Sequence, residues 1–201
     1  MKISAISVIL LLAFCAPAFA ADPADSSGKQ PMSEEHMQAW AKASTPGEEH
    51  KLLQRYVGRW DHVVSWWMKP DAKPEVSKGT TEIQSILGGR FIQQRATGTA
   101  MGQPFEGIGI IGYDNTLKHY STYWIDNMGT GSMSGTGKLD TASNAITDSG
   151  SFSCPMTPSG KQTYRGVWSL PQGNTFKYEM FAPGEDGKEF RWMEIVYTKA
   201  S

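Results

Sequence analysis

The pattern of hydrophobic and polar positions changes character at Gly58. Before this residue, apolar side chains recur at the i, i+3, i+4 spacing of an amphipathic helix, in a stripe made by Met37, Trp40 and Ala41. Ser33 precedes the stripe as a capping residue, and Thr45-Pro46-Gly47 interrupts it. A second short helix is predicted at 48–56, so residues 32–57 form a short helical unit.

Beyond Gly58 the chain consists of short strand-like runs separated by turn residues. Runs rich in Val, Ile, Thr, Tyr and Trp alternate with clusters of Gly, Pro, Asn and Asp, which is typical of β-strands joined by tight turns. Strands are predicted at 59–68, 78–87, 90–98, 105–113, 118–126, 130–138, 145–152, 163–170, 174–182 and 189–198.

The connections between these strands determine the fold. Gly88-Gly89 and the turn at 184–187 are hairpin loops, and connections this short make sequential strands antiparallel neighbours. Closure of such a meander removes its exposed edges. The sequence therefore predicts a mainly β domain at 58–199, a single antiparallel up-and-down barrel of eight to ten strands, with two short N-terminal helices.

The first twenty residues have the pattern of a secretory signal peptide. Lys2 is followed by an apolar run at 6–14 and by Ala18-Phe19-Ala20, a small-residue cleavage site. We expect export to the periplasm or beyond the cell, with residues 21–31 as a disordered tether. Cleavage leaves Cys154 as the one cysteine, which excludes an internal disulfide.

Charge and length exclude several classes of function. The whole chain has a formal net charge of −1 and no basic block, so nucleic acid is not an expected partner. After the leader, no apolar run approaches the ~20 residues that span a bilayer. The 21 glycines and seven tryptophans suit a strand-and-turn protein.

Several segments carry a family resemblance. His50 and Leu53 stand ahead of Gly58 and Trp60, and the Gly-x-Trp element resembles the first strand of calycin and lipocalin-like barrels. The further segments are Ile86-Leu87-Gly88-Gly89-Arg90-Phe91, Phe105-Glu106-Gly107, Gly112-Tyr113-Asp114-Asn115, Trp124-Ile125-Asp126-Asn127-Met128-Gly129-Thr130-Gly131, Asp186-Gly187-Lys188-Glu189 and Met193-Glu194-Ile195-Val196-Tyr197. Together they resemble a bacterial domain-of-unknown-function family, the one numbered fifteen seventy-nine, over residues 32–199. The resemblance implies a secreted lipocalin-like β-barrel and no particular activity.

The histidines offer one cofactor hypothesis. The spacing of His36, His50, His62 and His119 matches no zinc motif, so no metal site is predicted. If Trp60 faces inward, strand alternation places His62 on the same face. A haem or metal carrier through His62 or His119 is an alternative, weighed against hydrogen-bonded or exposed histidines. His50 is interpreted as a packing or capping residue, and no cofactor is expected.

Catalytic groups are sparse. Gly-x-Ser-x-Gly is absent from the sequence, and Cys154 has no basic neighbour in sequence that would lower the pKa of its thiol. Carboxylates within strands, among them Asp126 and Glu194, are costly if they face inward without a partner. An isomerase or hydrolase using Asp126 or Glu194 with Arg165 is therefore a second alternative, weighed against structural pairing of the same charges.

The preferred hypothesis is binding of a small, mainly apolar molecule in a barrel cavity, with catalysis disfavoured. Aromatic side chains supply apolar walls with polar tips, and a barrel of eight or more strands can enclose a small ligand. The candidate binding residues are Trp60, His62, Trp66, Tyr123, Trp124, Asp126, Arg165, Glu179 and Glu194.

Overall fold

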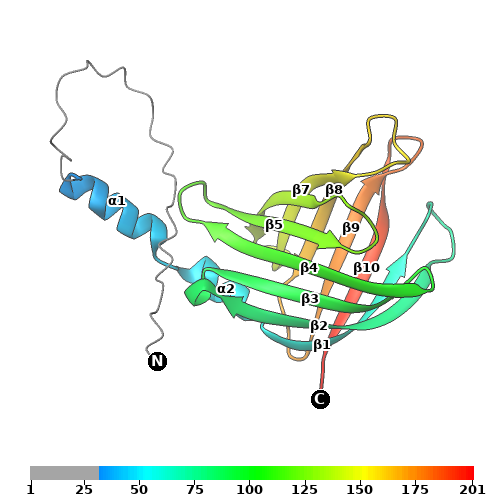
Figure 1. Ribbon diagram of the computed structural model, residues 1–201, viewed down its shortest axis with the longest axis horizontal. Helices are drawn as coiled ribbons and strands as arrows, with labels where there is room; N and C mark the ends of the chain where they lie inside the picture. Colours follow the sequence, from blue (N-terminus) through cyan, green and yellow to red (C-terminus); the bar gives the residue numbers. More distant parts are fainter. Residues whose placement is uncertain (1–31) are drawn as a thin grey trace, which may run out of the picture.

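The computed structural model describes residues 32–201 and contains ten antiparallel strands closed into one barrel (Figure 1). The strands are β1 (Gly58–Trp66), β2 (Glu75–Ile86), β3 (Phe91–Ala100), β4 (Gln103–Asp114), β5 (His119–Asp126), β6 (Met133–Asp140), β7 (Ala145–Ser153), β8 (Lys161–Ser169), β9 (Thr175–Pro183) and β10 (Glu189–Lys199). The predicted leader at 1–20 and tether at 21–31 lie outside the described residues.

Each strand pairs with its neighbour in sequence, and β1 pairs with β10 to close the barrel. This confirms the predicted antiparallel meander, and every predicted strand overlaps an observed one. One prediction of local detail is wrong. Gly88-Gly89 is not a two-residue hairpin loop, because residues Leu87–Gly89 form a 3₁₀ turn in which Gly88 has φ +66°.

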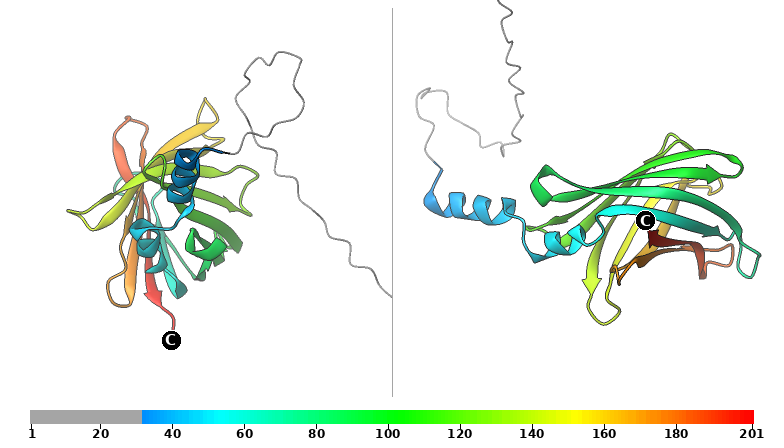
Figure 2. Two further views of the ribbon diagram at one scale, coloured as in Figure 1. Left: turned by 90° about the vertical axis from the view of Figure 1, so that its left-hand side faces the viewer. Right: turned by 90° about the horizontal axis from the view of Figure 1, so that it is seen from below.

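Two short helices precede the barrel. Helix α1 (Glu34–Ser44) begins where the Ser33 hydroxyl accepts the His36 N–H, and it buries none of its residues. Helix α2 (Glu48–Gln54) packs against β3 and β4, with Leu53 fully buried. The views in Figure 2 show α1 projecting away from the barrel, whereas α2 lies against its end. Among residues 32–201, no helix combines the length and apolarity needed to cross a membrane.

The antiparallel order gives the barrel two different ends. At the helix end, beside α2, lie the chain turns at 87–90, 115–118, 141–144 and 170–174. At the opposite end, here called the open end, lie the loops at 67–74, 101–102, 127–132, 154–160 and 184–188. The two ends differ in packing as well as in connections.

The hydrophobic core fills the helix end of the barrel. Leu53 from α2 joins a cluster of buried aromatic side chains that includes Trp60, Phe176 and Tyr197. Phe176 lies edge-on to Trp60, with ring centroids 4.8 Å apart, and stacks on Tyr197 at 4.1 Å. Large rings in such contacts stabilise a core beyond their buried area. The helix end is therefore closed by packed side chains.

Candidate functional site

Aromatic side chains on the inner wall at the open end remain partly exposed. We call Trp66, Phe105, Trp124, Phe152 and Trp192 the aromatic cup. Strand alternation directs Trp66, Phe105, Trp124 and Phe152 inward, and ring contacts with Trp66 and Phe152 place Trp192 beside them. None of the five is buried. Trp66 retains 37% of its surface. Inner-face rings thus reach solvent at this end of the barrel.

The cup has two aromatic groups held by ring contacts. Trp192 stacks on Phe152 with centroids 5.2 Å apart and meets Trp66 edge-on at 4.9 Å. Phe105 stacks on Trp124 at 6.4 Å. Apolar walls with a few placed polar groups are typical of sites for small molecules.

Trp124 is held flat against the inner wall by its neighbours. Its Nε1–H donates to Asp126 at 2.8 Å, and the other carboxylate oxygen of Asp126 accepts the Met128 N–H at 3.0 Å. The ring lies over Gly107, where an added Cβ would approach a ring carbon to 2.2 Å. Asp126 therefore orients Trp124, and both of its oxygens already accept hydrogen bonds.

A buried polar layer lies beneath the cup. Asp148 is two inner positions below Phe152 on β7 and is only 2% exposed. Its Oδ2 accepts hydrogen bonds from the Tyr164 hydroxyl at 2.9 Å and from the Thr122 hydroxyl at 3.0 Å. Burial raises the pKa of Asp148, although these hydrogen bonds act to lower it. The layer therefore favours a neutral acid.

The same layer contains buried polar atoms without hydrogen-bond partners. They are Asp148 Oδ1, Trp168 Nε1 and Tyr178 Oη. A Cβ on Gly166 would lie 2.4 Å from Asp148 Oδ1 and 3.0 Å from Tyr178 Oη, so the missing side chain of Gly166 makes room for both groups. Unpaired buried groups of this kind are costly, and they mark this layer as a polar floor under the cup.

His62 is buried on the opposite wall, with one ring nitrogen hydrogen-bonded and the other close to the backbone of β2. Nδ1 shares a hydrogen bond of 2.8 Å with the Thr81 hydroxyl. Nε2 faces Gly79, where a Cβ would approach it to 2.6 Å. Burial lowers the pKa of His62 and so favours the neutral ring. Nδ1 is thus engaged by Thr81, and Nε2 lies against the backbone at Gly79.

His119 and His50 have other positions. His119 precedes the inward-facing Tyr120 on β5, so it lies on the outer face and cannot serve as a ligand inside the barrel. His50 caps α2, because its Nδ1 accepts the Gly47 N–H at 3.0 Å. Among residues 32–201, no three His, Cys, Asp or Glu side chains gather as a metal site would require.

Five predicted binding residues lie on the inner face, but only some belong to the cup. Trp66, Trp124 and Asp126 lie at the open end. Trp60 is 1% exposed within the core and donates its indole N–H to the Tyr56 carbonyl at 2.8 Å. Trp60 and His62 therefore support the packed interior and do not line the accessible part.

The other four predicted binding residues lie on the outer face, which corrects their expected placement. Tyr123 is 46% exposed, beside the inward-facing Trp124. Arg165 pairs with Glu189 and lies 4.1 Å from the centroid of Phe181. Glu179 and Glu194 alternate with inward neighbours on β9 and β10, and the same alternation directs them outward.

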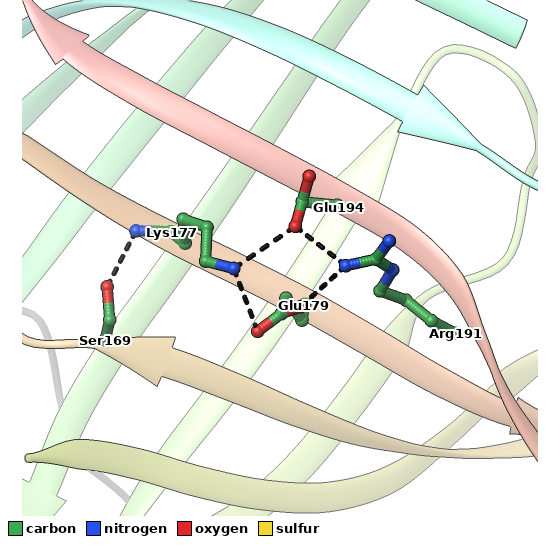
Figure 3. A network of polar contacts seen from close by, with 5 residues as sticks. All are labelled: Ser169, Lys177, Glu179, Arg191 and Glu194. Atoms are coloured by element: carbon green, nitrogen blue, oxygen red, sulfur yellow. Dashed lines mark hydrogen bonds and ion pairs between the residues drawn. The ribbon is translucent and has the colours of Figure 1, made fainter. Parts of the chain in front are cut away.

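Glu179 and Glu194 form a charge network across β9 and β10 (Figure 3). Lys177 Nζ lies 3.4 Å from Glu179 and 3.2 Å from Glu194. Arg191 contacts the same two carboxylates at 3.1 and 2.9 Å. Two cations thus balance two anions, which is a structural arrangement on the outer wall. Glu194 is engaged in this network and Arg165 in its separate pair with Glu189, so both act on the outer wall and not inside the barrel.

Asp148, Tyr164 and Thr122 were missed as candidate site residues. The signal for Asp148 is the alternation of β7, since this residue lies two positions from the apolar Ile146 and must share its face. The pattern that identifies Asp148 is a carboxylate on the same strand face as a core residue, with glycine at the next position of that face, Gly150.

Comparisons with known proteins place the chain in a family and a fold. Residues 45–199 match the family described as "Protein of unknown function (DUF1579)". No curated protein matches the chain. The crystal structure of Rv2717c from M. tuberculosis is similar with a TM-score of 0.55 and 13% identity, covering 78% of this chain and 100% of that one. A redesigned β-barrel gives a TM-score of 0.39 and 16% identity, covering 79% of this chain and 100% of that one.

Proposed function

Since the chain belongs to the DUF1579 family of proteins of unknown function, its role has to come from its own site, and we propose that it binds a small, mainly apolar molecule in the aromatic cup. The observation that carries this proposal is the partial exposure of inner-face aromatics at the open end, above a buried polar layer. Enclosed aromatic walls favour apolar ligands through burial of surface.

Binding without chemical conversion suits the polar groups of the cup. Asp126 is a carboxylate of the open end in contact with the cup, and Trp124 and the Met128 N–H already engage both of its oxygens. Asp148 lies in the polar layer beneath the cup and is almost fully buried. The fold is proposed to work as lipocalin-like barrels do, as a rigid container whose helix end is closed.

Titration with N-phenyl-1-naphthylamine, an apolar fluorescent probe, tests this function. We expect saturable binding that Trp124→Ala weakens by about fivefold or more, since truncating an aromatic anchor costs upward of ~1 kcal/mol. Tyr123→Ala is the matched control, because this neighbouring aromatic faces outward. Absence of probe binding, or equal loss in both variants, contradicts the proposal.

Export is the second part of the proposal. Residues 1–20 are proposed to direct the chain across a membrane and to be cleaved after Ala20, so the protein acts in the periplasm or outside the cell. The intact mass of the protein recovered from its own host tests this. A product that begins at Ala21 supports export, and one that retains the apolar run contradicts it.

A further inference from the structure

Four of the five loops at the open end each expose one methionine. Met101 is 75% exposed, Met156 86%, Met68 71% and Met128 41%. They lie in the loops at 101–102, 154–160, 67–74 and 127–132, respectively. We call these four side chains the methionine rim. The rim surrounds the end of the barrel to which the aromatic cup opens.

Three of the four loops that carry the rim are free of charge. The loops at 101–102, 127–132 and 154–160 contain no Asp, Glu, Lys or Arg. The other two open-end loops hold balanced charges, with three basic residues against three acidic ones: Lys69, Lys73 and Lys188, and Asp71, Glu185 and Asp186. The open end is thus apolar at its tips and electrically neutral.

The helix end provides the contrast. It also exposes single leucines, Leu87 and Leu117, and each shares its turn with a basic residue, Arg90 or Lys118, as only Met68 does among the four rim methionines. Singly exposed apolar residues are ordinary. What distinguishes the open end is that four separate loops, three of them uncharged, present flexible thioether side chains around one opening. Methionine adapts to irregular apolar surroundings and is common on binding surfaces.

We propose that the methionine rim docks the open end on the surface of a lipid bilayer with zwitterionic headgroups. This inference rests on the proposed ligand-binding function, because a bilayer holds apolar molecules and docking would bring the cup to them. Four apolar tips on separate loops suit shallow insertion into a planar interface, where buried apolar surface drives binding. The neutral loops match zwitterionic headgroups, whereas an anionic surface attracts basic clusters.

Sedimentation with phosphatidylcholine vesicles tests the proposal on the purified chain. We expect the wild type to partition onto the vesicles, and the triple variant Met68→Gln, Met101→Gln, Met156→Gln to lose about tenfold or more of its partition coefficient. The control is Leu87→Gln, Leu117→Gln, which removes exposed apolar side chains from the helix end. We expect this control to bind vesicles as the wild type does.

A binding assay without vesicles separates this proposal from the function on which it rests. The rim is outside the cup, so the triple variant keeps its affinity for N-phenyl-1-naphthylamine in solution. Loss of probe binding in the wild type contradicts the proposed function. Probe binding with no vesicle binding, or equal vesicle binding by wild type and triple variant, overturns the docking proposal alone.

Methionine oxidation gives an independent readout on the unmodified sequence. Dilute hydrogen peroxide converts exposed methionines to sulfoxides, which mass spectrometry locates. Vesicles are expected to slow oxidation of Met68, Met101 and Met156 but not of Met37, which is half exposed on α1. Protection of Met37 equal to that of Met68, Met101 and Met156, or no protection of any methionine, overturns docking through the rim. The docking proposal is also overturned if the methionine rim binds a protein tightly and does not bind vesicles.

Discussion

Asp148 is the one carboxylate among residues 32–201 that falls in the buried class. Its carboxyl group is enclosed by the Tyr164 and Thr122 hydroxyls, and Tyr178 and Trp168 approach the same layer without completing a hydrogen bond. Burial also raises the pKa values of Tyr164 and Tyr178, so both phenols stay neutral through the physiological range. The ionisation of Asp148 is therefore the event in this layer that pH controls.

Stability should depend on pH through Asp148. In the unfolded chain the Asp148 carboxyl group ionises near the ordinary pKa of 3.8, whereas in the folded chain it retains its proton to a higher pH because burial raises its pKa. The stabilisation is thus fully present below pH 3.8 and is lost as the pH rises through the raised pKa. Asp148→Asn removes this pH-dependent contribution to the free energy of unfolding. Urea unfolding from pH 4 to 8 should show the variant gaining stability relative to the wild type as pH rises, and a constant difference would contradict the raised pKa.

At the scale of strands, turn residues and alternation were enough to predict the fold. Short connections made every neighbour antiparallel, and the ten strands follow from runs between Gly, Pro, Asn and Asp. Whether an individual side chain points into or out of the barrel was predictable only on strands where one residue of known orientation fixes the alternation. Trp60 is such a residue for β1 and places His62 correctly, whereas β8–β10 have none.

The last strand shows why alternation alone was not enough for the candidate site. The register between β9 and β10 shifts between Arg191 and Met193, and this irregularity changes the phase along β10. Alternation from the buried Tyr197 puts Glu194 outside, beside Arg191, whereas Trp192, two residues earlier, reaches the cup because the phase changes between them. Neither a local bulge nor the difference between the two barrel ends can be deduced from the spacing of apolar residues.

Inner-face glycines couple neighbouring strands and supply a prediction at this scale. Gly166→Ala would place its Cβ 2.4 Å from Asp148 Oδ1 and 2.9 Å from Tyr178 Cε2, and both groups are buried. Such overpacking costs about 1–3 kcal/mol. Chemical denaturation should detect this loss, while Gly129→Ala, whose nearest atom would be 3.9 Å away, stays within about 0.5 kcal/mol. A neutral Gly166→Ala would contradict the close packing.

The whole molecule combines a closed, densely packed end with an accessible one, and ligand binding should act on them differently. Strand segments at the helix end surround the aromatic core, so their amides should exchange hydrogen only through global unfolding. Segments near the loops at 101–102 and 154–160 lack such packing and should exchange faster.

Hydrogen exchange with mass spectrometry, with and without N-phenyl-1-naphthylamine, tests this division. A ligand that binds only the folded state stabilises it by mass action, and a ligand in the cup also suppresses local opening around it. Slower exchange is therefore expected first in peptides from the open-end halves of β5 and β7, which carry Trp124 and Phe152. Helix α1 buries nothing and should exchange rapidly in both states. Protection that begins at the helix end would instead locate the ligand against α2 and exclude the cup as its site.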